Sequence, residues 1–267
     1  MAQAVCNDIQ LSYDDSNPTG YQPAVVFLHG VTLNRGMWEP QQHSLRGRFR
    51  VIAYDLRGHG RSEKPRTGYG RAEEVRDLLA LLDHLRLSRA ALVGLGRGAS
   101  IALDFALQHP DRTRALVLMA PPVDTERFVP EMVAHWTRAV DTLRENGLRA
   151  AREFWLGLDL YAPAREKPEM ARALEEMVGL YTGPHWIDPD PPSNPSLAEV
   201  AAELRRPALV LIGERDLQGF HNAADYLSEK LPQGEKRSIA DAGHLVSLEA
   251  PEEVNRALGE FLAKSAG

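Results

Sequence analysis

The stretch that decides the fold is Ala91-Leu92-Val93-Gly94-Leu95-Gly96-Arg97-Gly98-Ala99-Ser100-Ile101-Ala102. An apolar run ends at Gly94, small residues then alternate with larger ones, and apolar residues return at helical spacing with Ile101 and Phe105. This order predicts a buried strand, a very sharp turn and a helix. Glycines on both sides of the turn allow the strand and helix backbones to approach each other closely.

The turn Gly94-Leu95-Gly96-Arg97-Gly98 resembles the nucleophile elbow, G-x-S-x-G, of the α/β-hydrolase family. In that motif the central residue has strained backbone geometry and presents its side chain to the substrate. Gly96 stands at the central position here, so the resemblance implies an elbow that lacks its nucleophilic serine. A dinucleotide-binding loop is the alternative, but no acidic residue ends a strand about 20 residues further on, as that motif requires.

The composition is that of an ordinary globular protein, with 267 residues, 43% hydrophobic, 25% charged and a net charge of −6. Scattered Lys and Arg argue against a nucleic-acid partner. No apolar run approaches the roughly 20 residues of a membrane span, and the N-terminus lacks the pattern of a secretory signal. Cys6 is the only cysteine, so we expect a cytoplasmic protein without a membrane partner.

Apolar runs rich in β-branched residues predict buried strands at 24–28, 50–54, 91–94, 115–120 and 208–212. A short strand is expected near 236–239, and the alternating residues 9–13 predict a half-buried edge strand. Amphipathic helices are expected over 71–87 and after Pro251. With the resemblance, the expected class is α/β: an α/β-hydrolase fold with a mostly parallel sheet of the eight-stranded type, flanked by helices.

Residues 124–206 interrupt this alternation, because they contain no convincing strand. Helical patterns cover 129–143, 148–160 and 169–180, and a proline-rich connection follows at 184–195. In the family this position holds a helical cap, so we expect a core of residues 1–123 and 207–267 and a cap of residues 124–206. The cap carries Trp136, Trp155 and Trp186 as candidate contacts for an apolar or ring-containing small molecule.

Two loops resemble the family's loops around the elbow. His29-Gly30-Val31 matches the loop in which the residue after His-Gly donates a backbone N–H to the oxyanion hole, so Val31 and Arg97 are the implied donors. His29 is expected to hold this loop rather than act as a base, and with Gly30 it is a candidate substrate contact. Residues 55–62 match D-x-R-G-x-G-x-S, with an expected structural ion pair between its Asp and Arg.

Asp216 and His244 stand where the family places its acid and its histidine, after the two last strands. The order nucleophile, Asp, His is that of the α/β-hydrolase triad. Asp216 would accept the imidazole Nδ1–H and leave Nε2 of His244 to act as a general base. We expect neither a metal nor a cofactor at this site. The sequence does not indicate which oligomeric state the protein adopts.

Gly96 leaves three interpretations open. The chain is a hydrolase of ester, lactone or similar acyl bonds whose serine was replaced or naturally lost, so that activity is severely reduced or altered. Alternatively, the Asp216–His244 pair activates water or abstracts a substrate proton, as in a lyase or isomerase. In the third, the chain binds a ligand without turnover. Ser100 is expected to pack between helix and sheet and not to replace the missing nucleophile.

Overall fold

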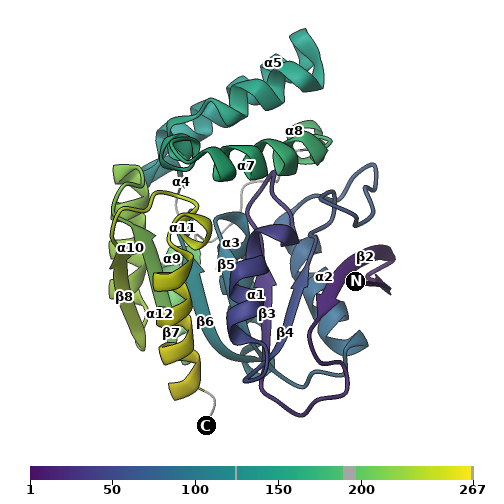
Figure 1. Ribbon diagram of the computed structural model, residues 1–267, viewed down its shortest axis with the longest axis vertical. Helices are drawn as coiled ribbons and strands as arrows, with labels where there is room; N and C mark the ends of the chain where they lie inside the picture. The colour runs from purple at the N-terminus through teal and green to yellow at the C-terminus, as the bar shows by residue number, and fades with distance from the viewer. Residues whose placement is uncertain (124, 189–196, 266–267) are drawn as a thin grey trace.

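The computed structural model describes residues 1–123, 125–188 and 197–265. Their centre is an eight-stranded sheet in the order β1-β2-β4-β3-β5-β6-β7-β8 (Figure 1). The strands are β1 (Ala2–Cys6), β2 (Ile9–Asp15), β3 (Ala24–Leu28), β4 (Arg50–Tyr54), β5 (Ala90–Leu95), β6 (Thr113–Met119), β7 (Ala208–Gly213) and β8 (Gly234–Ile239). The expected fold class is confirmed.

The first two strands are the antiparallel part of the sheet. β1 pairs with β2 and β2 with β4 in antiparallel register, whereas every pairing from β4 through β8 is parallel. The prediction that residues 9–13 form the edge strand is wrong, because β1 lies outside β2. β1 is a short strand with three exposed residues, which gives a weak apolar signal.

Helices cover both faces of the sheet. α1 (Glu39–Leu45) packs against α12 (Pro251–Lys264) in front of the strands, and α2 (Arg71–His84) packs against α3 (Arg97–Gln108) (Figure 1). α10 (Gln218–Lys230) contacts β7 and β8. All residues of β3, β4, β5 and β7 are buried, as expected for parallel strands that are covered on both faces.

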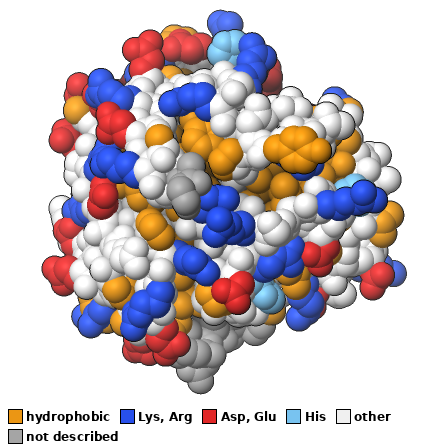
Figure 2. Space-filling view, turned by 90° about the horizontal axis from the view of Figure 1, so that it is seen from below, with side chains coloured by type: hydrophobic (Ala, Val, Ile, Leu, Met, Phe, Trp, Pro, Cys, Tyr) orange, Lys and Arg blue, Asp and Glu red, His pale blue; other side chains and the backbone are white. Residues whose placement is uncertain are grey.

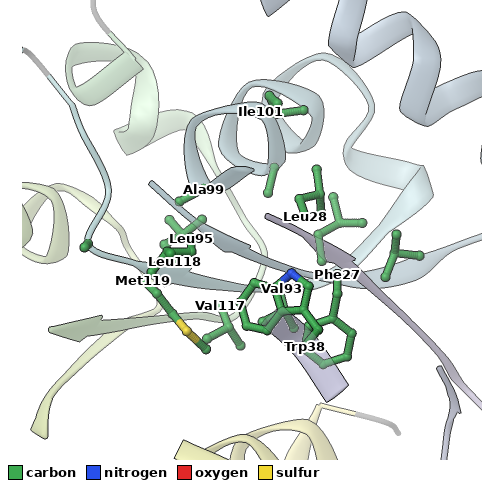
Figure 3. Packing of buried hydrophobic residues seen from close by; sticks show 14 of the residues in the cluster. Phe27, Leu28, Trp38, Val93, Leu95, Ala99, Ile101, Val117, Leu118 and Met119 are labelled. Atoms are coloured by element: carbon green, nitrogen blue, oxygen red, sulfur yellow. The ribbon is translucent and has the colours of Figure 1, made fainter. Parts of the chain in front are cut away.

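The junction of β5 and α3 is packed tightly against β3. A Cβ on Gly94 would overlap the backbone carbonyl of Gly98, and a Cβ on Gly98 would overlap the carbonyl of Leu28. Figure 3 shows Leu95, Ala99 and other core side chains gathered around this junction. The two glycines therefore allow α3 to start directly above the sheet.

In the described chain between β6 and β7, every regular element is a helix. It comprises α4 (Thr125–Phe128), α5 (Pro130–Leu156), α6 (Ala162–Arg165), α7 (Pro168–Leu180), α8 (Pro184–Ile187), α9 (Leu197–Val200) and short 3-10 turns. α5 is interrupted at Gly147, where φ is 84° and ψ is 174°, so it corresponds to two of the predicted helices. α5, α7 and α8 lie above the sheet in Figure 1. Part of the proline-rich connection, residues 189–195, lies outside the described residues.

Figure 2 shows the molecule turned by 90° from Figure 1 and seen from below, from the end away from α5, α7 and α8. On that face, Lys and Arg are interspersed with acidic and apolar side chains rather than gathered into one patch. Among the helices that the structure describes, none combines the length and the apolar character needed to cross a bilayer.

Candidate active site

Gly96 forms the tip of the turn between β5 and α3. Its backbone angles are φ 53° and ψ −118°, in a region that side-chain-bearing residues rarely adopt. A Cβ placed on Gly96 would lie 3.8 Å from Nε2 of His244, with no closer neighbour within 4 Å. A side chain at this position would thus extend toward the imidazole of His244 without a steric clash.

His244 is held by Asp216 at the carboxyl ends of β8 and β7. Nδ1 of His244 lies 3.0 Å from Oδ2 and 3.3 Å from Oδ1 of Asp216, and the Asp216 side chain is fully buried. Because a carboxylate only accepts hydrogen bonds, the network assigns the proton to Nδ1. Nε2 then carries a lone pair on the side that faces Gly96. The structure brings these predicted residues together as a dyad opposite the turn.

Glu249 fixes the backbone on both sides of His244. Its carboxylate accepts the N–H of Gly243 at 2.6 Å and the N–H of Leu245 at 3.0 Å. Burial raises the pKa of Glu249, while the two backbone hydrogen bonds oppose that rise. Sequence reasoning missed this residue, since its only signal is an acidic side chain five positions after the histidine.

Val31 and Arg97 both line the cavity beside Gly96. Arg97 is the first residue of α3, and the N–H groups of a first helical turn have no acceptor within their own helix. Val31 precedes Thr32, which has a positive φ of 67°. The backbone N–H of Thr32 donates to Nε2 of His59 at 3.2 Å, and this bond fixes the loop.

The cavity above Gly96 has a volume of about 370 Å³. Core and inserted helices both line it, and its aromatic walls are Trp136, Trp155, Tyr161 and Phe220. The rings of Trp136 and Trp155 meet edge to face at 5.8 Å, and Phe220 lies 4.5 Å from the His244 ring. Phe220 was not singled out in the sequence, because a lone aromatic residue usually belongs to the core.

Trp186 and Ser100 have different surroundings from those expected, whereas His29 holds its loop as expected but does not line the cavity. Trp186 packs 5.5 Å from Trp155, and neither it nor His29 is among the described residues that line the cavity. His29 is fully buried, its Nδ1 bonds Gly30 O and its Nε2 accepts the Leu56 N–H. Burial lowers the pKa of His29, as suits a neutral ring that holds the loop. Ser100 is buried but lines the cavity, which corrects the expected helix–sheet location.

The expected ion pair within residues 55–62 is wrong. Asp55 pairs with Arg35, whereas Arg57 pairs with Asp77 at 2.6 Å. Ser62 donates to Asp55 O at 2.6 Å. Asp55 and Arg57 of this loop therefore pair with residues elsewhere in the chain, while the Ser62 hydrogen bond lies within the loop. Within the described residues, no group of three or more His, Cys, Asp or Glu side chains could hold a metal ion.

Comparisons with known proteins find a family model and several relatives that match most of the chain. The family model described as "alpha/beta hydrolase fold" matches residues 23–251. A Bacillus subtilis protein proposed to be a 2-succinyl-6-hydroxy-2,4-cyclohexadiene-1-carboxylate synthase is 27% identical, over 97% of this chain and 96% of its own. The 3-oxoadipate enol-lactonase 2 of Acinetobacter baylyi is 26% identical, over 94% of this chain and 92% of its own.

Solved structures show the same similarity. The malate-bound thermophilic esterase from Thermogutta terrifontis superimposes with a TM-score of 0.83 at 28% identity. The match covers all of this chain and 99% of the esterase. The whole architecture, inserted helices included, is therefore shared with this esterase.

Proposed function

The chain belongs to the α/β-hydrolase family, and from this premise we propose that its cavity binds the ester, lactone or similar acyl bond of a small molecule, with Gly96 at the nucleophile position. The observation that carries the proposal is the alignment of Gly96, His244 and Asp216. His244 Nε2 is 3.8 Å from a Cβ at Gly96, while Nδ1 is hydrogen-bonded to Asp216. A serine at Gly96 would complete a triad in the family's order.

The backbone N–H groups of Val31 and Arg97 are the proposed oxyanion hole. Both residues line the cavity next to Gly96, where the carbonyl oxygen of an acyl group aligned with His244 would lie. Donors fixed in the backbone stabilise the charge that develops on this oxygen without having to reorganise. The site thus retains the parts of an acyl-transfer machine that do not depend on the residue at Gly96.

The proposed substrate is small and apolar or ring-containing. A cavity of about 370 Å³ with Trp136, Trp155, Tyr161 and Phe220 in its walls suits a compact ring or short acyl chain. The relatives include an enol-lactonase and an esterase, both of which cleave an acyl–oxygen bond. We further propose that residues 124–206 act as the cap, over a core of residues 1–123 and 207–267.

Glycine has no nucleophilic atom, so an acyl-enzyme cannot form at Gly96. The chain as it stands therefore binds the acyl compound, but without an acyl-enzyme its turnover is severely reduced. The test is Gly96→Ser, assayed with p-nitrophenyl esters of increasing acyl length. A gain of several orders of magnitude supports the proposal, whereas a folded serine variant with no gain contradicts it.

A second candidate is favoured by the lone pair on His244 Nε2, which faces the cavity. There the dyad could activate water or remove a substrate proton directly. His244→Ala in the unsubstituted chain separates the candidates. Loss of a measurable activity supports base catalysis by the dyad. A ligand-binding role is supported instead if turnover is absent, calorimetry detects binding of a carboxylic acid, and His244→Ala leaves the affinity for that acid unchanged.

A further inference from the structure

Arg97 is anchored by an acidic side chain from another helix. Glu74, on α2, is 1% exposed, and its Oε2 lies 2.9 Å from Arg97 Nη2, while Oε1 accepts from Arg97 Nε at 3.0 Å. Arg97 also donates to Tyr69 O at 2.6 Å. This two-point contact fixes the side chain of a residue whose backbone N–H is a proposed oxyanion donor.

Glu74 also contacts the inserted helices. Nε2 of His185, on α8, lies 3.2 Å from Glu74 Oε1, and both side chains are 1% exposed. Burial, reinforced by the positive charge of Arg97, lowers the pKa of His185. A neutral His185 therefore donates Nε2–H to Glu74 and accepts from the Tyr181 hydroxyl at Nδ1, 3.1 Å away.

The other proposed donor is supported from the same side. Thr32, next to Val31, donates its N–H to His59. The His59 ring stacks on Tyr181 at 4.8 Å and lies 4.9 Å from the His185 ring. Segment 181–188 thus contacts Glu74, which holds Arg97, and His59, which holds the loop at Val31. A third contact, from Asp188 Oδ2 to the Gly68 N–H at 2.8 Å, fixes the far end of this segment.

We propose that Glu74 is a positioning residue that couples the seating of segment 181–188 to the oxyanion hole of Val31 and Arg97. The coupling to catalysis rests on the function proposed above. When the segment is seated, Glu74 holds Arg97 at the start of α3. When the segment lifts, Glu74 loses its hydrogen bond from His185, and His59 loses its ring contacts with Tyr181 and His185.

Glu74→Gln is the sharpest perturbation, because it keeps the shape of the side chain and removes its charge. Arg97 Nε and His185 Nε2 both bond Oε1, so an amide that keeps its oxygen there places its NH₂ group 2.9 Å from Arg97 Nη2, donor against donor, and loses the charge-assisted contact. Glu73→Gln is the matched control. Glu73 is the neighbouring residue on α2, is 33% exposed and pairs with Arg76.

The first measurement is hydrogen–deuterium exchange of the chain as it stands. We expect Glu74→Gln to speed exchange about tenfold or more in segment 181–188 and in the first turn of α3, residues 97–100, while β5 and β6 remain protected. His185→Gln, made from the other side, should also speed exchange at 97–100. If His185→Gln affects only its own segment, or if Glu73→Gln matches Glu74→Gln, the coupling is overturned.

The second measurement places the same substitutions in a Gly96→Ser background. A displaced oxyanion donor acts on the transition state, so Glu74→Gln should lower kcat about ten- to hundredfold with little change in KM. Glu73→Gln should leave both unchanged. An active serine variant whose kcat is insensitive to Glu74→Gln contradicts the coupling and leaves the hydrolase function standing. An inactive serine variant contradicts the function, and the exchange experiment still decides the coupling.

Discussion

Gly94, Gly96 and Gly98 serve different purposes although they belong to one motif. A Cβ at Gly94 or Gly98 would overlap backbone atoms, whereas a Cβ at Gly96 meets only His244 Nε2, at an ordinary contact distance of 3.8 Å. The positive φ of 53° at Gly96 strains any side chain, and glycine relieves that strain. Gly96 is thus the one position of the three that could accept a side chain without a clash.

Gly98→Ala should destabilise the fold by about 3 kcal/mol or more, because backbone atoms of β3 must move to admit the methyl group. Gly179→Ala in α7 is the control, since a Cβ there meets nothing within 4 Å. It should be neutral or stabilise by up to about 1 kcal/mol. Urea denaturation measures both. Equal stability of the two variants would show that the elbow is not tightly packed.

Asp216→Asn in a Gly96→Ser background should lower kcat by about 10³- to 10⁴-fold. An amide donor facing Nδ1 would favour the tautomer with its proton on Nε2 and so remove the base. Glu214→Gln, an exposed change in the same loop, is the control and should leave kcat unchanged. A similar loss in both variants, or in neither, would contradict the assigned role of Asp216.

Site residues in short motifs at the ends of strands could be predicted from the sequence. The side chains that hold those residues in place could not. Gly96, Asp216 and His244 each belong to a short motif with a chain order. Glu249 and Glu74 act through contacts that depend on the packing of distant elements, and a lone glutamate on a helix carries no signal of this.

Among the elements, most long helices were predictable, with the 13-residue α10 as an exception, and short helices were not. The two helical patterns before residue 160 correspond to α5, which is broken at Gly147, because glycine interrupts the apolar periodicity there. α8 has only four residues, too few to show a period, and it lies in a proline-rich stretch. The element that seats the insertion on the core was therefore missed.

α5 contributes an aromatic wall to the cavity, so Trp136→Ala should change substrate preference. In a Gly96→Ser background we expect KM for a phenyl ester to rise about tenfold, and KM for a short aliphatic ester to rise less. Leu180→Ala is the control, because Leu180 is 61% exposed at the end of α7. If the two esters respond equally to Trp136→Ala, Trp136 does not recognise the ring.

At the scale of the whole molecule, the parallel sheet was predictable from its uninterrupted apolar strands. The N-terminal edge was not, because β1 has only five residues, mostly small, and three of them are exposed. The loop of residues 55–62 was recognised, but Asp55 and Arg57 find their partners in distant segments. Long-range pairing of charges is decided by the fold and leaves no local pattern.

Stability of the whole fold should fall in mild acid. Burial lowers the pKa of His29, His59 and His185 below the ordinary value of 6.5. Below about pH 6.5 the unfolded chain therefore binds protons that the folded chain does not, which costs up to about 1.4 kcal/mol per pH unit for each histidine. The contribution is fully present above that pH and is lost as the pH falls toward the folded pKa values.

Urea unfolding between pH 7.5 and 5.5 measures this slope. His185→Gln should reduce the total loss of stability over this range by about 1.4 kcal/mol, or about 0.7 kcal/mol per pH unit on average, since one fewer buried neutral histidine remains. His84→Gln, which changes an exposed histidine, is the control and should leave the slope nearly unchanged. An unaltered slope in His185→Gln would show that the buried rings do not cause the acid sensitivity.

The central claim is that Gly96 occupies the nucleophile position of an otherwise assembled acyl-hydrolase site. The most direct measurement is covalent labelling of Gly96→Ser by a fluorophosphonate, located by peptide mass spectrometry, with His244→Ala and Ser100→Ala as companion changes. The account predicts one label per chain at the substituted position, lost with His244→Ala and retained with Ser100→Ala. Labelling of the unsubstituted chain at Ser100, or no labelling of a folded serine variant, would contradict it.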